Sequence, residues 1–465
     1  MKLKNQAQHK NRFGGPNKNL ILIVLISFVL PVFAQETQSK QTYAFSLDQA
    51  ISHALTNNYS VINSQRDIAS AKQKKWETTA NGLPQINGSL EYGNNFAYTQ
   101  QGVTGGGAFG GTAGEVSTIA FGTKHNMTAR ATLSQLIFDG SYVVALQASK
   151  TYIKYFENIK QKTDIEIREA VINSYGNVLL AKESISILEK NKTTLSKTLS
   201  DTKETFNNGL IEEENVEQLQ ITLASVNSSL NNTQRLLDVA YKMLKITLGM
   251  DLDDALTLTD KLDDLTLANL DLTFSQDTFN ISNNMNYRLA ENFKDQRRLE
   301  YKLQKSKALP SLAANLNFGY NAFSNEFAFF TPHQKWNNFS NLGIGLNVPI
   351  FSSFGRAAKT QQAKIAFDQA KTQFIETQQK LQLQYESVKS EYEFSVEEYT
   401  TAKNNLNLAE RIEKKQQIKF TEGLSSSFDF SEAQRQLYSA QQNYLQSMVN
   451  IISKKASLDA VINKK

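Results

Sequence analysis

The sequence predicts an α+β membrane protein built from two internal repeats, each with two membrane-spanning β-strands and long coiled-coil α-helices. Three observations lead to this prediction. A helix–glycine–helix pattern recurs 214 positions apart, at Gly209 and Gly423. Four segments alternate apolar and polar residues as membrane strands do. Two stretches of 65 residues each contain no proline, so each can form a very long helix.

The N-terminus resembles a secretory signal peptide. Residues 1–18 carry five basic residues and no acid, and an apolar run follows at 20–33. Val32 and Ala34 place small residues where a signal peptidase reads, so we expect cleavage after Ala34. A retained membrane anchor is the alternative. Cleavage would remove five of the 50 basic residues and leave 45 against 45 acids, which offers no basic patch for nucleic acid.

The chain contains no cysteine, which excludes disulfides and a lipid on an N-terminal cysteine. The mature sequence has no second long apolar run, so no transmembrane helix is expected. Attachment to a membrane would then depend on β-strands or on a surface helix.

Apolar residues recur every seven positions in both repeats, a spacing typical of a coiled-coil seam. The positions are Val216, Leu223, Leu230, Leu237 and Leu244 in the first repeat and Phe430, Leu437, Tyr444, Ile451 and Leu458 in the second. Each seam follows a proline-free stretch, 142–206 or 356–420, that would be roughly 98 Å long as a helix. Helices of this length belong to a helical array.

The alternating segments lie at 86–92, 127–134, 312–322 and 342–350. Alternation over about ten residues suits a strand that turns apolar residues to lipid and polar residues to a lumen. A half-buried soluble sheet would show the same pattern. The segments between the strands, 99–121 and 323–339, are long, and the second is rich in aromatic residues that suit a membrane interface or an exposed loop.

Each repeat therefore reads helix, strand, loop, strand, long helix, break, helix. The first helix is expected to begin at Ser46, which forms a capping-box pattern with Gln49. Pro84 and Pro310 are expected to end the first helix of each repeat before a strand. The expected domains are a signal peptide at 1–34, a first repeat at 35–249, a linker at 250–276 and a second repeat at 277–465.

Four strands cannot close a barrel, because single-chain bacterial barrels start at eight strands. An open strand edge in lipid would leave backbone groups unpaired at several kcal/mol each. The sequence therefore predicts an obligate oligomer, without fixing the number of subunits.

The break between the last two helices carries a specific motif: an aromatic residue, a glycine, an acid and an alanine, here Phe420, Gly423, Asp429 and Ala433. The first-repeat copy is looser, with Phe206, Gly209, Asn215 and Leu219. With this motif and the duplicated element order, essentially the whole mature chain resembles the TolC-like outer-membrane efflux family.

The resemblance implies a homotrimer with a 12-stranded barrel in outer-membrane lipid and a helical tunnel in the periplasm. It implies a passive exit duct for small molecules such as drugs and toxic compounds, fed by an inner-membrane RND or ABC pump through a periplasmic adaptor. A protein-export duct of a type I secretion system is an alternative within the family. A soluble periplasmic coiled-coil scaffold is an alternative from another class.

The acids Asp429 and Glu432 have two interpretations. They can cap the last helix, with Asp429 near its N-cap. By the resemblance, they also line a constriction at the periplasmic tip, where rings of carboxylates would select cations. Some members carry a basic latch residue where this chain has Ser425, and the counterpart of Asp429 is the neutral Asn215, so a hydrogen-bonded closure through these two is possible.

The resemblance also implies that the adaptor contacts the tips at Gly209, Leu210, Gly423 and Leu424. No motif supports catalysis. Gly105, Gly107 and Gly110 fit a phosphate-loop pattern, but no strand and helix frame them. The histidines are scattered without the spacing of metal ligands. We therefore expect no enzyme activity, no cofactor and no metal site.

Overall fold

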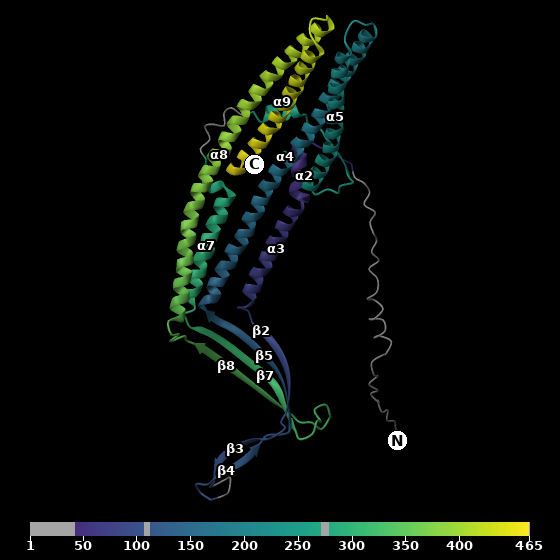
Figure 1. Ribbon diagram of the computed structural model, residues 1–465. Helices are drawn as coiled ribbons and strands as arrows, with labels where there is room; N and C mark the ends of the chain where they lie inside the picture. The colour runs from purple at the N-terminus through teal and green to yellow at the C-terminus, as the bar shows by residue number, and fades with distance from the viewer. Residues whose placement is uncertain (1–41, 107–111, 271–278, 465) are drawn as a thin grey trace, which may run out of the picture. The chain divides into compact units, whose positions relative to one another are not determined.

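The computed structural model describes residues 42–106, 112–270 and 279–464 (Figure 1). The expected signal peptide at 1–34 lies outside the described residues. The elements of the first half are β1 (Thr42–Phe45), α2 (Leu47–Asn57), α3 (Tyr59–Ala80), β2 (Gln85–Asn94), β3 (Thr99–Thr104), β4 (Val116–Phe121), β5 (His125–Asp139), α4 (Gly140–Asn207) and α5 (Glu213–Leu248). Those that follow are β6 (Ala255–Leu258), α6 (Leu262–Ala268), the 3₁₀ helix η3 (Ile281–Asn283), α7 (Met285–Ser306), β7 (Ser311–Ser324), β8 (Trp336–Asn347), α8 (Gly355–Thr421) and α9 (Ser427–Ile462).

The four predicted strands form one antiparallel sheet in the order β2-β5-β7-β8. Strands from the two halves meet at its centre, where Leu133 of β5 lies opposite Leu316 of β7. The register places most of the large apolar residues of the four strands on one face, and many of them are exposed. They include Ile86, Leu90, Leu316, Phe318, Leu342, Ile344 and Leu346. The opposite face is polar, with rows such as Asn87, Thr132, Asn317 and Asn341.

The two predicted long helices are confirmed as α4, with 68 residues, and α8, with 67 residues. Figure 1 shows that α4 with α5, and α8 with α9, form two helical hairpins. The seven-residue seams of α5 and α9 are buried or half-buried, as the spacing predicts. The helices α3, α4, α7 and α8 connect directly to the sheet strands, so the hairpin tips lie at the far end from the sheet.

Ser46 begins α2 with the expected capping box, and α3 and α7 end before Pro84 and Pro310. Other details differ from the sequence-based expectation. The first helix is interrupted at Asn58, whose side chain caps α3. Residues 99–121 contain a second hairpin, formed by β3 and β4. Each of these strands has only six residues, so they lack the long alternating pattern that predicted the other strands. β8 ends at Asn347, short of the predicted 350.

The expected linker at 250–276 also contains β6, which pairs with β1, and α6, which packs on α9. The order of helices and strands on either side of this segment fits the expected duplication. The domain boundaries themselves stay a prediction.

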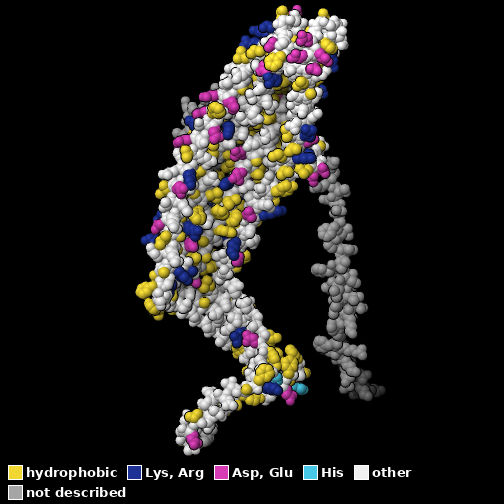
Figure 2. Space-filling view, viewed as in Figure 1, with side chains coloured by type: hydrophobic (Ala, Val, Ile, Leu, Met, Phe, Trp, Pro, Cys, Tyr) yellow, Lys and Arg dark blue, Asp and Glu magenta, His cyan; other side chains and the backbone are white. Residues whose placement is uncertain are grey.

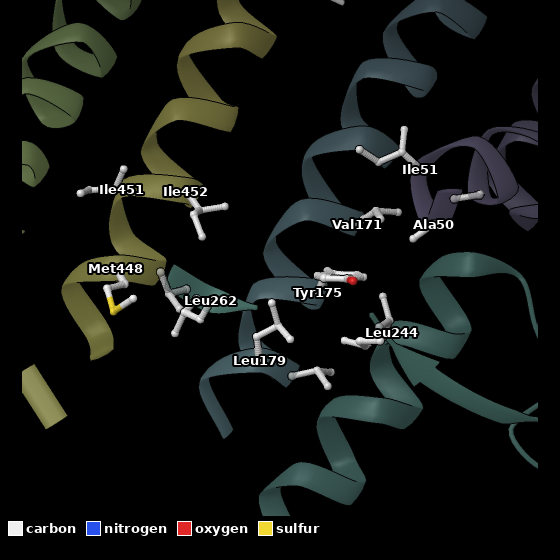
Figure 3. Packing of buried hydrophobic residues seen from close by; sticks show 14 of the residues in the cluster. Ala50, Ile51, Val171, Tyr175, Leu179, Leu244, Leu262, Met448, Ile451 and Ile452 are labelled. Atoms are coloured by element: carbon white, nitrogen blue, oxygen red, sulfur yellow. The ribbon is translucent and has the colours of Figure 1, made fainter. Parts of the chain in front are cut away.

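The largest apolar core lies where α2, α6 and β6 pack on the long helices (Figure 3). Tyr175 of α4 sits in this core with no exposed surface, beside Leu179 and Leu244. Its hydroxyl donates to the backbone oxygen of Phe45 at 3.0 Å and lies 3.1 Å from Oδ2 of Asp260. The same carboxylate oxygen accepts from the backbone N–H of Leu47 at 2.7 Å. Burial raises the pKa of Tyr175, so the hydroxyl stays protonated and donates.

Two asparagines play the same part in the two halves. Asn58 caps α3 with Oδ1 and donates from Nδ2 to the backbone oxygen of Thr247, in the last turn of α5, at 2.8 Å. Asn284 caps α7 and donates to the backbone oxygen of Val461, in the last turn of α9, at 2.8 Å. Each asparagine therefore ties a short helix to the end of a long one. At Gly249, just after α5, φ is +75°, and a Cβ would meet the backbone oxygen of Asn57 at 2.2 Å, so only glycine fits.

The substitution Tyr175→Phe is expected to lower the free energy of unfolding by about 1–3 kcal/mol, because it removes the donor to Phe45 and a partner of the Asp260 carboxylate. The measurement is the thermal transition of the detergent-solubilised protein, followed by circular dichroism at 222 nm. Tyr59→Phe is the control, because Tyr59 is exposed. Equal transitions for the two variants would contradict the role given to Tyr175.

Candidate functional site: the paired helix tips

The two hairpin tips end their long helices with the same hydrogen-bond motif. In the first tip, the N–H of Gly209 binds the oxygen of Phe206 at 2.8 Å, and the N–H of Leu210 binds the oxygen of Thr205 at 3.2 Å. This is a Schellman motif, and it needs a positive φ at the glycine, here +74°. The second tip repeats it at Gly423, where φ is +71°. The two glycines therefore let the chain reverse its direction at each tip, as the glycine breaks in the sequence predict.

Leu210 and Leu424 follow the two glycines and form the apices of the turns. Their side chains are 74% and 78% exposed, which is high for leucine and leaves both free to contact another protein.

The second tip starts its return helix at Ser426, three residues earlier than the expected cap at Asp429. Ser426 Oγ accepts from the N–H of Asp429 at 3.1 Å and lies 2.8 Å from Oδ2 of the Asp429 carboxylate. Ser425 Oγ lies 3.4 Å from the same carboxylate oxygen and 3.2 Å from Oε1 of Gln416. Asp429 is thus the third helical residue, in a position where a carboxylate favours the positive end of the helix dipole.

Asn215 connects the two tips. Its Oδ1 accepts from the backbone N–H of Ser427 at 3.2 Å, across 212 residues of sequence, while its Nδ2 donates to the oxygen of Glu212. Ser427 is buried, whereas Asn215 is half-buried. Within one chain, Asn215 therefore bonds to the backbone of Ser427 and not to Ser425.

An apolar cluster lies directly beneath the tips and joins the two hairpins. Phe430 of α9 has no exposed surface and stacks on Phe420 of α8, with ring centroids 5.4 Å apart. Its neighbours come from the other hairpin: Leu195, Leu199, Val216, Leu219 and Val226. Burial of this cluster, rather than the polar contacts above it, provides most of the attraction between the hairpins at this level.

A cleft of about 1350 Å³ separates the two tips above the cluster. Its walls carry four acids and one base: Asp201, Glu212, Glu422, Asp429 and Lys197. Figure 2 shows acidic side chains gathered at this end of the helices. The cleft is therefore acidic, and cations are the ions that its charge favours.

Glu432 lies one turn beyond Asp429 on α9. The guanidinium of Arg435 pairs with its carboxylate, and Gln436 donates to it at 3.1 Å. Asp429 therefore lines the tip cleft without a basic partner among the salt bridges of the described residues, whereas the Arg435 guanidinium compensates the charge of Glu432. Sequence reasoning missed Arg435, although an acid three residues before a base on one helix is a recognisable signal.

Below the tips, Glu413 of α8 is half-buried near Tyr438 of α9. Burial raises the pKa of the Glu413 carboxyl above its ordinary value of 4.5. Burial, together with the nearby Glu413 charge, raises the pKa of Tyr438 to about 12. An ionised Glu413 is therefore unfavourable in the folded chain.

Solved structures of known proteins share this architecture. The outer membrane protein VceC of Vibrio cholerae superimposes with a TM-score of 0.68 at 15% identity, over 90% of this chain and 95% of that one. The CmeC outer membrane channel of Campylobacter jejuni gives a TM-score of 0.67 at 17% identity, over 90% of this chain and 85% of that one. The fold is that of outer-membrane channels built from a two-faced sheet and long helical hairpins.

Sequence comparison gives the family. The outer membrane efflux protein family matches residues 50–250 and 281–464, and the chain belongs to this family. The outer membrane protein TolC of Vibrio cholerae is 23% identical over 333 residues, covering 68% of this chain and 72% of that protein. The predicted membership of the TolC-like family is confirmed.

Among the described helices, none combines the length and the apolar character needed to cross a bilayer. Over the same part of the chain, no three His, Asp or Glu side chains group in a way that could hold a metal ion.

The raised pKa of Glu413 predicts a pH dependence. The folded state binds the proton more tightly than the unfolded state, so this group contributes stability below pH 4.5 that is lost as the pH rises through its folded pKa. Glu413→Gln mimics the protonated form and is expected to raise the melting temperature at pH 7.5 more than at pH 4.5. Glu410→Gln, an exposed neighbour on α8, is the control. An equal effect of Glu413→Gln at the two pH values would contradict this prediction.

Proposed function

We propose that this protein is the passive outer-membrane exit duct of a tripartite efflux system, with its helices in the periplasm. The observation that carries the proposal is the sheet: one face is apolar and exposed, the other is polar, and its edge strands β2 and β8 each have only one neighbour within the described chain. A sheet of this kind is stable in a bilayer only if further strands close it.

Three copies would supply twelve strands, and this number lies within the range of known barrels. The helices support the same assembly. α5 exposes an apolar stripe at a helical spacing, formed by Leu236, Val239, Met243 and Ile246. In a homotrimer this stripe would be covered by a neighbouring copy, while the polar faces of the sheet and hairpins line a continuous duct.

A passive duct supplies no energy for transport, and nothing in the described chain indicates catalysis. Efflux through the duct would therefore need an energy source in another protein. An inner-membrane pump of the RND or ABC class, linked by a periplasmic adaptor, would provide it. The exposed Leu210 and Leu424, with the adjacent Gly209 and Gly423, form the surface that we assign to the adaptor. Small molecules such as drugs and toxic compounds are the proposed permeants.

The purified mature chain is expected to run as a trimer in mild detergent and to conduct ions in planar bilayers. The measurements are the mass of the protein–detergent complex, by light scattering, and the single-channel current. A monomer that releases from membranes without detergent and passes no current would favour the soluble coiled-coil scaffold and contradict the duct.

At the tips we propose that Asp429 dominates a cation-selective constriction, because Glu432 is compensated by Arg435. Ser425 and Ser426 would position the Asp429 carboxylate, and Asn215 would hold the two tips together.

Asp429→Asn is therefore expected to reduce the preference for K⁺ over Cl⁻ and to weaken block by divalent cations, because it removes three carboxylates from the trimer ring. Glu432→Gln should have a smaller effect. The readouts are the reversal potential in a KCl gradient and the blocking concentration of Mg²⁺. Asp48→Asn, at an exposed acid of α2, is the control. Equal effects of the two tip variants would show that the Arg435 pair does not compensate Glu432.

A further inference from the structure

The polar face of the four-stranded sheet carries three charged side chains among the described strand residues: Glu91, Arg130 and Asp139. Asp139 is the last residue of β5, in the row nearest the helices, and its carboxylate caps α4. Glu91 and Arg130 are the two that lie away from the strand ends. They lie in neighbouring rows of the register. One row joins Ser89, Arg130, Gly319 and Phe339, and the next joins Glu91, Thr128, Asn321 and Asn337. β2 runs away from the helices, so the Glu91 row lies about 7 Å further from them than the Arg130 row.

Arg130 is held in place by an aromatic ring. Its guanidinium carbon lies 5.8 Å from the centre of the Phe339 ring, two strands away on the same face. Gly319 lies between them, and a Cβ at this position would come within 2.9 Å of Cζ of Phe339. The glycine therefore leaves room for the ring to lie across the sheet towards the guanidinium, a favourable cation–π arrangement.

Arg130 does not pair with Glu91. Within the described residues, neither side chain takes part in an ion pair, although their rows are adjacent. Arginine keeps its charge at every accessible pH, so the Arg130 row carries a permanent positive charge. The next rows towards the helices offer uncharged side chains, such as Asn87, Thr132 and Asn317. In the last row the Asp139 carboxylate accepts from the backbone N–H groups of Ser141 and Tyr142 at the start of α4.

We propose that Arg130, positioned by Phe339, forms a basic ring inside the barrel, preceded on its outer side by an acidic ring of Glu91. The inference rests on the proposed function, because it requires the polar face to line a lumen and three copies to close it. The two rings form a selectivity element separate from the tips. A cation that enters from outside is drawn to Glu91 and then meets the three Arg130 guanidinium groups, which oppose its passage.

The test is the reversal potential of single channels in a KCl gradient. Arg130→Gln is expected to shift selectivity towards K⁺, and Glu91→Gln is expected to shift it towards Cl⁻. Arg130→Lys keeps the charge and should stay close to the wild type. The shift should be larger near 0.1 M salt, where the Debye length is about 10 Å, than at 1 M, where it is about 3 Å. Lys72→Gln, an exposed position on α3, removes the same charge elsewhere.

A second variant covers the case in which Arg130→Gln does not assemble. The chain has no cysteine, so Ser89→Cys places a single thiol in the row of an intact Arg130. An anionic methanethiosulfonate is expected to modify this thiol faster than a cationic one of similar size. Equal rates, or a faster cationic reagent, would overturn the basic ring. So would an unchanged reversal potential in a conducting Arg130→Gln channel. A wild-type protein that passes no current would instead overturn the duct and the ring together.

Discussion

The open edges of the sheet are the constraint from which the proposed assembly follows. β2 and β8 each leave one side of their backbone without a strand partner in the described chain. In hydrocarbon each unpaired backbone group costs several kcal/mol, so one chain cannot hold this sheet in a bilayer. The exposed apolar stripe on α5 likewise favours burial against a neighbouring copy. Strand closure and helix burial are thus satisfied by the same neighbouring copies.

Three long-range ties join the long helices to the segments packed beside them. Asn58 and Asn284 each cap one helix and bind the last turn of another, and the Tyr175–Asp260 contact secures the segment before α2. These contacts are buried or half-buried, where a lost partner costs more than a surface contact contributes. They lie near the middle of the long helices. The tips beyond them depend on the Phe430 cluster and on a few polar contacts.

Few polar contacts join the two tips. Within the described residues, the side chains that join the tips make one bond from Asn215 and one long contact between Thr222 and Ser431. Separating the tips would break these two contacts and expose part of the apolar cluster around Phe430, whereas the core around Tyr175 is a separate cluster. Acids line the cleft at the tips, and a basic side chain lies on the polar face of the sheet at the other end of the helices. In the proposed duct these two sites would lie in series. Two filters of opposite sign in series would limit the passive leak of ions of either charge.

Local patterns in the sequence determined the type and order of most elements. The seven-residue seams, the alternating strands and the glycine breaks each depend on neighbours within a few residues, so they are readable without a structure. The first-helix interruption at Asn58, the small hairpin β3–β4 and the Glu432–Arg435 pair are local too, but their signals are short. Only the tertiary structure decided which residues far apart in the sequence meet: Asn58 with Thr247, Asn215 with Ser427, and Arg130 with Phe339. These pairs are separated by about 190 to 212 positions, and their contact depends on helix packing and strand register, which no local periodicity specifies.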